Sequence, residues 1–310
     1  MKEINLHIGA HKTATTFIQE TLEKNISLLE NKNIFYCSRL KYTKKLNWNI
    51  LRRIEGVTGN LQKLDSTQLR KELKSFENEY LLKNKIIISD EEISGSLNLK
   101  VTKYLYNDVG KYLNFINTEL KNYKIKIFFC IRNYASFIES AYLQLVKMGV
   151  SYSFKSFISK EVLENLSWLS ILQNILDSSK NVELVVWDYE SFSSDDNFKK
   201  KIISKIAFNI DPKSFYLIQD KKINPSYSEE ALKIAIAANS ILSKKEDKNK
   251  VRAFLTKNFS TKQGYNKPSL FSNQEYDLLS LRYKQDIEQI KSMKNIIYLQ
   301  PSNNIFPFFN

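Results

Sequence analysis

The sequence predicts an α/β protein with a central parallel sheet flanked by helices. Three observations support this class. Over the first 190 residues, short runs rich in β-branched and aromatic residues alternate with longer stretches of helical periodicity, the pattern of successive β-α-β units. The strand-like runs are almost continuously apolar, as in strands covered by helices on both faces. Hydrophobic residues make up 43% of the 310 residues, enough to fill a large core.

The expected elements follow this pattern in order. The strands are expected at 4–9, 33–37, 85–89, 124–131 and 182–187. Helical periodicity predicts helices between them at 15–29, 66–82, 99–122 and 136–148, and later helices at 195–208, 228–242, 248–258 and 273–293. No Pro/Gly-rich linker or repeat divides the chain. We therefore expect one domain over residues 1–310, with an α/β core over 1–190 and a mostly helical part over 191–310.

The composition favours an anionic partner without fixing its kind. The chain carries 47 Lys and Arg against 33 Asp and Glu, a formal net charge of +14. Such an excess suits a nucleotide, an acidic glycan, nucleic acid or a membrane surface, but a generally lysine-rich, solvated surface accounts for it equally well. Cys37 and Cys130 lie in or beside apolar strands and are expected to be buried thiols.

The sequence offers no motif for a metal or for insertion into a membrane. No spacing of His, Cys and carboxylate residues indicates a metal site. No charged leader with an apolar segment opens the chain, and no apolar run approaches the ~20 residues that span a bilayer. These features predict a cytoplasmic protein.

The segment HIGAHKTATT, residues 7–16, links the first expected strand to the first helix. Gly9 ends the strand, and Thr15 and Thr16 open the helix. A chain that turns from strand to helix presents unpaired backbone N–H groups, which together with the helix dipole bind anions. The hydroxyls of Thr13, Thr15 and Thr16 can add donors. The segment therefore predicts a phosphate-binding loop, with an ordinary strand-to-helix turn as the alternative.

The loop does not fit the nucleoside triphosphatase pattern G-x-x-x-x-G-K-[ST]. Counted from Gly9, the second glycine position holds Ala14, and Lys12 comes three residues before the lysine position. A lysine inside the loop would lie over the terminal group of a bound phosphate chain. There it can neutralise charge that develops on a bridging oxygen as a group leaves.

A second polar segment, CIRNYASFIESAYLQLVK, follows the fourth expected strand. Arg132 leaves the strand end, and Ser136, Ser140 and Lys147 lie on the polar side of the following helix. Arg132 and Ser140 are expected to converge and to hold a second phosphate, because ligands of open parallel sheets bind at the carboxyl ends of strands. The alternative is a salt bridge from Arg132 to a nearby carboxylate.

Together, HIGAHKTATTFIQ and IRNYASFIESAYLQLVK resemble the paired motifs of sulfotransferases that use 3′-phosphoadenosine-5′-phosphosulfate (PAPS). In that family the first loop holds the 5′-phosphosulfate. The second segment, commonly R-[DN]-P-x-x-R-x-x-S-x-Y, holds the 3′-phosphate, and Arg132, Asn133, Ser140 and Tyr142 fall in register. Weaker similarities lie in WDYESF, which suggests Tyr189 near the adenosine, and in NPSYSEEALKIAIAAN. The resemblance is to bacterial, carbohydrate-modifying members.

The resemblance implies a P-loop-like sulfotransferase fold, PAPS as donor, 3′,5′-ADP as product and no metal. It makes Lys12 the catalytic lysine, which stabilises the phosphate oxygen left when the sulfuryl group departs in line. The implied cofactor-binding residues are Gly9, His11, Lys12, Thr13, Ala14, Thr15, Thr16, Arg132, Ser140, Tyr189 and Lys222.

The sequence also departs from the family pattern. Ala14 replaces the usual glycine, which is tolerable if its φ is negative. Tyr134 stands where proline is common, and Phe137 stands where a second arginine often stands. Lys221 or Lys222 could supply the missing positive charge.

Sulfuryl transfer to a hydroxyl needs a base, typically Glu or His. The third expected strand ends in IIISDEEISG, and a glutamate often follows this strand in carbohydrate sulfotransferases. Glu91 is favoured, then Glu92, with His11 as a rival; the alternative is a solvated acidic turn that caps the next helix. His7 is expected to be a buried histidine with its hydrogen bonds satisfied.

The acceptor implied by the resemblance is a carbohydrate hydroxyl on a surface polysaccharide, lipopolysaccharide or glycolipid, the last compatible with peripheral contact at a membrane. Other classes stay open: a P-loop kinase or NTPase, a non-catalytic nucleotide-binding protein, or a nucleic-acid-binding protein. A nucleic-acid partner is not expected, because the lysines are spread along the chain and no recognition motif is present.

Overall fold

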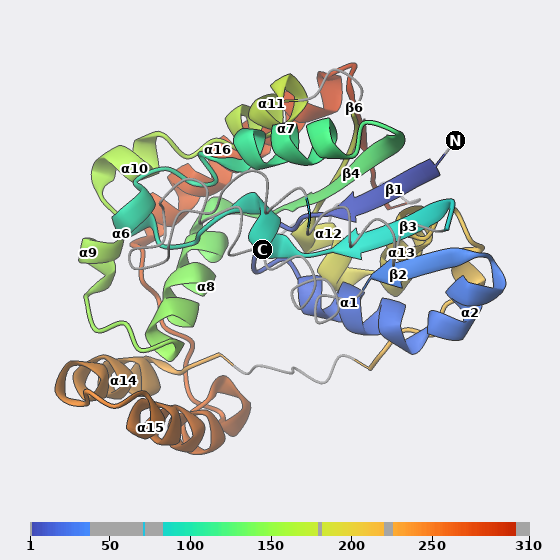
Figure 1. Cartoon of the computed structure of the whole chain (residues 1–310). Coiled ribbons are helices and arrows are strands. Elements are labelled where there is room, and N and C mark those ends of the chain that lie inside the picture. The colour runs from blue at the N-terminus through green and yellow to red at the C-terminus, as the bar shows by residue number, and fades with distance from the viewer. Residues whose placement is uncertain (1, 38–70, 72–82, 179–181, 220–225, 302–310) are drawn as a thin grey trace.

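Six parallel strands in the order β2-β3-β1-β4-β5-β6 form the central sheet (Figure 1). The computed structural model describes residues 2–37, 71, 83–178, 182–219 and 226–301. The strands are β1 (Lys2–His7), β2 (Ile34–Cys37), β3 (Lys85–Ser89), β4 (Tyr123–Ile131), β5 (Glu183–Asp188) and β6 (Ile296–Tyr298). The predicted fold class, a parallel sheet flanked by helices, is confirmed.

The strand order reverses at the centre of the sheet. β1 pairs with β3 on one side and with β4 on the other, all in parallel register. The chain leaves β1 toward β2 and leaves β4 toward β5, so the two following loops diverge between the carboxyl ends of β1 and β4. In open α/β sheets, ligands bind at such a reversal.

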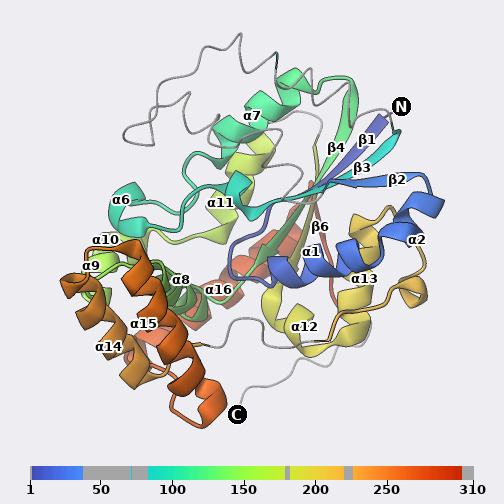
Figure 2. The ribbon, with the colours of Figure 1, turned by 60° about the horizontal axis from the view of Figure 1, so that its bottom comes forward.

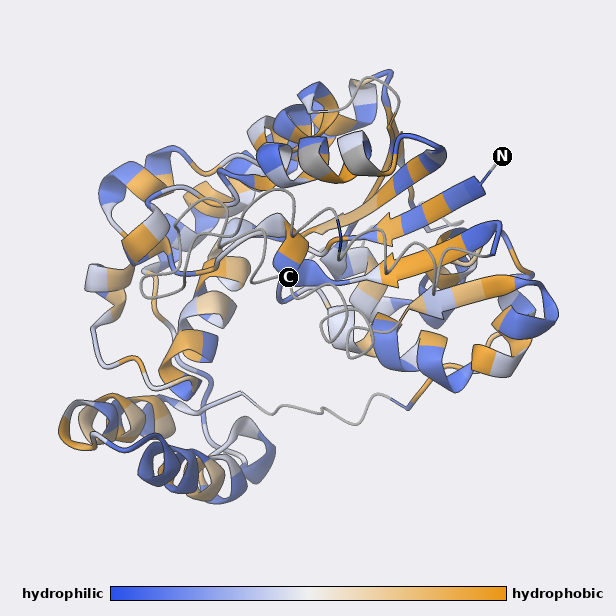
Figure 3. Cartoon of the chain, viewed as in Figure 1, coloured by the Kyte–Doolittle hydropathy of each residue, from blue (hydrophilic) through white to orange (hydrophobic). Residues whose placement is uncertain are grey.

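Two helical layers cover the sheet, one on each face (Figure 2). One layer consists of α1 (Thr15–Lys24), α2 (Ile26–Asn31), α12 (Tyr189–Ser194) and α13 (Asp196–Ile206). The other contains α7 (Val109–Glu119), α8 (Tyr134–Lys147), α11 (Trp168–Asp177) and α16 (Asn273–Ser292). Figure 3 shows long hydrophobic stretches in β3 and in the second half of β4, whereas β1 alternates between hydrophilic and hydrophobic residues.

Shorter elements complete the described chain. They are η1 (Glu91–Ser94), α6 (Leu99–Thr102), α9 (Phe154–Phe157), α10 (Lys160–Glu164), η2 (Pro212–Ser214), α14 (Glu229–Ile241), α15 (Lys245–Asn258) and η3 (Thr261–Gln263). The α14–α15 pair lies away from the sheet beside the far end of α8 in both views (Figures 1 and 2). Asn239 fixes it there by donating to the carbonyls of Val146 and Val150 at 2.8 and 2.9 Å.

Two expected helices are interrupted. The helix expected at 15–29 breaks at Asn25, whose side-chain amide donates to the carbonyls of Thr21 and Tyr216 and so ties the break to a distant segment. The helix expected at 99–122 is divided into α6 and α7, because Lys103 and Tyr106 take left-handed backbone conformations with φ of 60° and 52°. Apart from residue 71, which is helical, the helix expected at 66–82 lies outside the described residues.

The predicted burial of the cysteines is confirmed, since Cys37 and Cys130 both lie in the interior of strands. No helix among the described residues combines the length and the apolar character that a bilayer crossing needs.

Candidate functional site

The loop after β1 stays bound to β4 before it turns into α1. The N–H groups of Ile8 and Ala10 donate to the carbonyls of Phe128 and Cys130. Gly9 has a φ of 109°, and a Cβ at this position would lie only 3.2 Å from the Cβ of Glu91. Glycine is therefore required here for both its backbone conformation and the close approach of Glu91.

Two non-glycine residues of the loop adopt left-handed conformations. Lys12 has a φ of 62° and Ala14 a φ of 61°. The condition under which an alanine would be tolerated without strain at position 14, a negative φ, is therefore not met, and the left-handed conformation costs roughly 1–2 kcal/mol for an L-residue. A loop with such residues turns successive N–H groups toward one point and forms an anion-binding concavity.

The start of α1 leaves its donors available. Ala14 occupies the N-cap, and no side chain caps the first turn, so the leading N–H groups of Thr15 and Thr16 have no intrahelical partner. Thr15 is buried and Thr16 is exposed. The hydroxyl of Thr13 instead donates to the carbonyl of Ala10 at 2.6 Å and closes the loop.

Lys12 lies partly buried between this loop and α8. Its Nζ donates to Oε1 of Gln144 at 3.4 Å. Burial lowers the pKa of Lys12, the positive charge of Arg132 lowers it further, and the negative charge of Glu91 opposes both. Among the described residues, no carboxylate lies within ion-pair distance of Lys12.

Arg132 is held by contacts from four directions. Its Nη1 donates to the carbonyl of Lys12 at 2.6 Å and its Nε donates to the hydroxyl of Ser136 at 3.0 Å. Its guanidinium carbon lies 4.5 Å from the centre of the Tyr189 ring, and its own carbonyl accepts from Nε1 of Trp168 at 2.7 Å. The guanidinium thus bridges the loop after β1 to the helix after β4.

The alternative for Arg132, a salt bridge to a carboxylate, does not occur among the described residues. The nearest hydroxyl partner is Ser136, while Ser140 lies one turn further along α8 and is half-buried. Asn133 begins α8, and its backbone N–H donates to Oε1 of Glu190 at 3.0 Å. The structure therefore brings Lys12, Arg132 and Tyr189 together, and the hydroxyl that Arg132 contacts is that of Ser136 rather than the expected Ser140.

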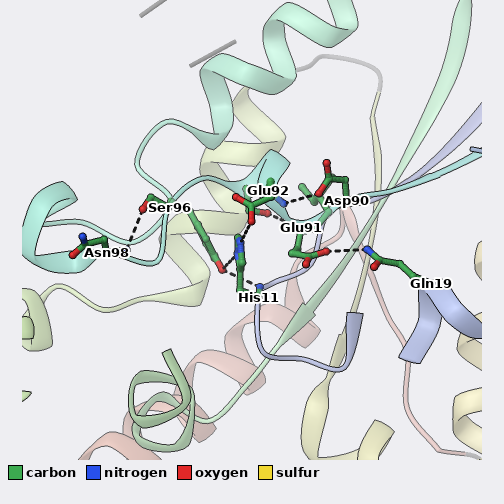
Figure 4. Close-up of polar contacts among 10 residues, drawn as sticks. His11, Gln19, Asp90, Glu91, Glu92, Ser96 and Asn98 are labelled. Atoms are coloured by element: carbon green, nitrogen blue, oxygen red, sulfur yellow. Dashed lines mark hydrogen bonds and ion pairs between the residues drawn. The ribbon is translucent and has the colours of Figure 1, made fainter. Parts of the chain in front are cut away.

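The acidic segment after β3 separates its three side chains (Figure 4). Asp90 caps η1 by accepting from the N–H of Glu92 at 3.1 Å. The capping part of the alternative is therefore met, but the turn is not solvated there, because Asp90 is fully buried. Glu91, however, is buried with 8% exposure. Its Oε2 accepts from Nε2 of Gln19 at 2.9 Å, so Gln19 fixes this carboxylate beside Gly9 and the loop.

His11 is oriented by Tyr106. The Tyr106 hydroxyl lies 3.0 Å from the backbone N of His11, which donates to it, and 2.9 Å from Nδ1 of the ring. The other ring nitrogen, Nε2, lies 3.7 Å from Oε1 of Glu92.

His7 is buried at the end of β1, as expected, but its hydrogen bonding is incomplete. Nδ1 lies 2.8 Å from the Ser89 hydroxyl, whereas Nε2 has no partner among the described residues. The ring stacks on Trp187 at 5.9 Å. Burial lowers the pKa of His7 to about 4, although the charge of Glu91 partly opposes the shift.

Several contact residues were not predicted. Gln19, Tyr106 and Gln144 hold Glu91, His11 and Lys12 respectively, and each belongs to an element other than its partner's. Of these three residues, only Gln144 could have been found from the sequence, because it lies on the polar side of the helix that carries Ser136 and Ser140. Lys221 and Lys222 lie outside the described residues.

No protein-family model matches the sequence, and no curated protein matches it. Among solved structures, the crystal structure of a sulfotransferase from Alicyclobacillus acidocaldarius is similar to this chain, with a TM-score of 0.40 and 12% sequence identity. The similarity covers 77% of this chain and 93% of that one.

Proposed function

We propose that this protein is a PAPS-dependent sulfotransferase that modifies a carbohydrate hydroxyl. The observation that carries the proposal is the meeting of Lys12 and Arg132 between the carboxyl ends of β1 and β4, where Arg132 Nη1 donates to the Lys12 carbonyl at 2.6 Å. Two cations without an ion-paired carboxylate among the described residues suit a ligand with more than one anionic group. The two sequence motifs that resemble the family contain these same residues.

The residues present fit a nucleotide with two separated anionic groups. The loop after β1, with its left-handed residues and uncapped helix start, would hold the 5′-phosphosulfate together with Lys12. Arg132 and Ser140 would hold the 3′-phosphate, and Tyr189, already stacked on Arg132, would lie beside the adenosine. When bound, PAPS supplies the sulfuryl group.

Lys12 provides positive charge where negative charge develops during transfer. Its surroundings lower its pKa through burial, and in such a partly desolvated site a charge interacts more strongly than it does in water. The link from Arg132 to the Lys12 carbonyl holds the lysine backbone in place before any ligand arrives. The scheme therefore relies on preorganised charge and uses no metal.

Glu91 suits the role of base better than His11. Gln19 holds Glu91 through Oε2 at 2.9 Å, and this carboxylate lies beside Gly9 of the loop that would hold the phosphosulfate, where it would accept the proton of the acceptor hydroxyl. Both ring nitrogens of His11 already face other side chains, since Nδ1 lies 2.9 Å from the Tyr106 hydroxyl and Nε2 lies 3.7 Å from Oε1 of Glu92. In this proposal His11 orients the acceptor or supports Glu92, and Glu91 removes the proton.

The structure offers little support for the rival P-loop kinase or NTPase. Such enzymes need a carboxylate for magnesium near the strand ends. Asp90 and Asp188 follow or end strands, but Asp90 caps η1, and Asp188 accepts from the N–H of Ser191 and the hydroxyl of Tyr298. Both carboxylates are thus engaged in holding the chain.

Calorimetric titration with 3′,5′-ADP in EDTA tests the proposal. The wild type should bind in the absence of metal and should bind ATP–Mg²⁺ far more weakly. Arg132→Ala and Lys12→Ala should each weaken binding by tenfold or more, because each removes a charge-assisted contact of about 1.5–3 kcal/mol. Lys24→Ala, an exposed change in α1, is the matched control and should bind as the wild type does. Failure of the wild type to bind would refute the proposal.

A further inference from the structure

The α14–α15 pair, which projects from one end of the molecule, carries a cluster of positive charge (Figures 1 and 2). Over residues 244–267, which include α15 and the turn after it, eight lysine or arginine residues stand against two acidic ones. The two acids, Glu246 and Asp247, both lie in the first turn of α15, where they complement the helix dipole. The remainder of the segment is basic, so this end of the molecule attracts an anionic partner.

Three aromatic rings form a row in the same segment. The ring centre of Phe259 lies 6.0 Å from that of Phe254 and 5.4 Å from that of Tyr265. Phe254 is 58% exposed and Tyr265 is 37% exposed. The neighbouring Leu255 is buried and belongs to the main hydrophobic core. The packing of α15 therefore uses Leu255, and Phe254 remains on the surface.

Lysines flank Phe254 along α15. Lys250 lies four residues before it and Lys257 three residues after it, the spacings at which helical side chains are neighbours. At 100° per residue, the three side chains start within about 60° of one another around the helix. Both lysines are exposed, and Lys250 pairs with Asp247 at 3.3 Å, a surface pair of the kind that contributes little. The solvent-facing side of α15 thus combines an apolar ring with two ammonium groups.

This combination suits an anionic lipid surface better than other anionic partners. Aromatic side chains enter the headgroup region of a membrane, and lysines beside them are attracted by anionic lipids. A second copy of the chain would bring like charges together. Single-stranded nucleic acid also combines with rings and cations, but it is held in a positively charged groove, whereas Phe254 and its lysines lie on the exposed face of a projecting helix.

We infer that Lys250, Phe254, Lys257, Phe259 and Tyr265, here termed the aromatic–basic patch, dock the protein on an anionic lipid surface. Phe254 and Tyr265 enter the headgroup region, Phe259 joins their rings, and the two lysines contact lipid phosphates. The inference goes beyond the proposed function and does not depend on it. Docking of this kind would hold the protein at a surface that carries glycolipids, one of the acceptor classes considered above.

Vesicle sedimentation tests the inference. The protein, in about 0.1 M NaCl, is mixed with vesicles of phosphatidylcholine alone or with about one third phosphatidylglycerol. The wild type should bind the anionic vesicles at least about tenfold more tightly than the neutral ones. Phe254→Ala should weaken binding to the anionic vesicles about tenfold, because it removes an inserted ring. Lys257→Gln should weaken it about fivefold, because it removes one charge at the lipid surface.

Leu278→Ala and Lys160→Gln are the matched controls. Both residues are exposed on helices other than α15, Leu278 by 59%, and both variants should bind as the wild type does. A tryptophan in place of Phe254 reports on the ring position directly. The fluorescence of Phe254→Trp should shift to the blue when anionic vesicles are added, whereas that of Leu278→Trp should not.

Four results would overturn the inference. The wild type could bind neither kind of vesicle, or both kinds equally. Binding could depend on Lys257 but not on Phe254, which would assign it to general surface charge. Single-stranded DNA could bind in a manner that Phe254→Ala weakens while vesicles do not bind, which would make the patch a nucleic-acid site.

Discussion

Ala14 shows how the anion loop constrains a single residue. Its φ of 61° was not foreseeable from the sequence, because the conformation is imposed by the strand before it and the helix after it. Gly9, by contrast, could be singled out from the sequence, because a glycine follows the first apolar strand. The nearby Glu91 side chain explains why a larger residue does not fit there.

Replacing Ala14 with glycine should stabilise the protein. Glycine removes the left-handed penalty of roughly 1–2 kcal/mol but adds unfolded-state entropy of roughly 0.5–1 kcal/mol. The expected net gain is about 0.5–1 kcal/mol in urea unfolding. Ala237→Gly, in the exposed interior of α14, should instead lose about 1 kcal/mol. A loss of stability in Ala14→Gly would contradict the loop conformation.

His7 should make stability depend on pH. Its pKa is about 4 in the folded protein and about 6.5 when unfolded, so between these values the unfolded chain binds more protons. Stability should therefore fall as the pH drops from 6.5 toward 4, with about 2 kcal/mol lost at pH 5 through this residue. His7→Asn should remove that component. Urea unfolding at pH 7 and pH 5 measures it, and an identical pH dependence in both proteins would refute the assignment.

At the scale of elements, strands were easier to predict than short helices. β3 matches its expected range, and β2, β4 and β5 lie close to theirs, because long apolar runs in the interior of a sheet leave a clear pattern. β6 has three residues, too few for a periodic signal, and it is defined by pairing with β5. The break at Asn25 depends on a contact with Tyr216, which no local pattern reveals.

Within the site, too, residues in a local sequence pattern were predictable and residues that act through distant contacts were not. Lys12, Arg132 and Tyr189 were predicted because they stand in or beside motifs at strand ends. Gln19 and Tyr106 were missed because their roles come from tertiary contacts with Glu91 and His11. Side chains that orient other side chains carry no signal of their own in a single sequence.

The carboxylate of Asp286 connects α16 to the start of α11. Asp286 accepts from the backbone N–H groups of Trp168 and Leu169 at the start of α11, and from the hydroxyl of Tyr134. It therefore completes the N-terminus of α11 as a capping residue would. Trp168 in turn donates to the Arg132 carbonyl.

Loss of this carboxylate should be costly. Asp286→Ala removes the acceptor of the Tyr134 hydroxyl and of the Leu169 N–H, while the Trp168 N–H keeps the Tyr134 hydroxyl at 2.6 Å. Each donor left without an acceptor costs about 1–3 kcal/mol, so a total loss of about 3 kcal/mol is expected in urea unfolding. Asp277→Ala, exposed on the same helix, should change stability by less than about 0.5 kcal/mol. Equal effects of the two substitutions would show that Asp286 does not secure α11.

At the scale of the whole molecule, α8 holds the two cations at the carboxyl ends of β1 and β4. Its first turn holds Arg132, its third turn contacts Lys12, and Lys147 ends it. The net charge of +14 is a weaker guide, because charge distributed over a surface attracts any polyanion without selecting one.

Salt should separate the specific site from this general charge. At 0.5 M NaCl the screening length falls to about 4 Å, which suppresses interactions between exposed charges but affects partly buried ones less. Binding of 3′,5′-ADP should weaken only a few-fold between 0.1 and 0.5 M NaCl. Any binding of duplex DNA should disappear over the same range. Nucleotide binding that vanishes together with DNA binding would assign both to the general surface charge.

The central claim is that Arg132 recognises a 3′-phosphate, and a double cycle between protein and ligand tests it most directly. The affinities of 3′,5′-ADP and 5′-AMP are measured by calorimetry in EDTA for the wild type and for Arg132→Ala. The wild type should prefer 3′,5′-ADP by roughly 30–150-fold, equivalent to about 2–3 kcal/mol for a charge-assisted contact. Arg132→Ala should lose most of this preference while its affinity for 5′-AMP changes little. An equal preference in both proteins would contradict the account.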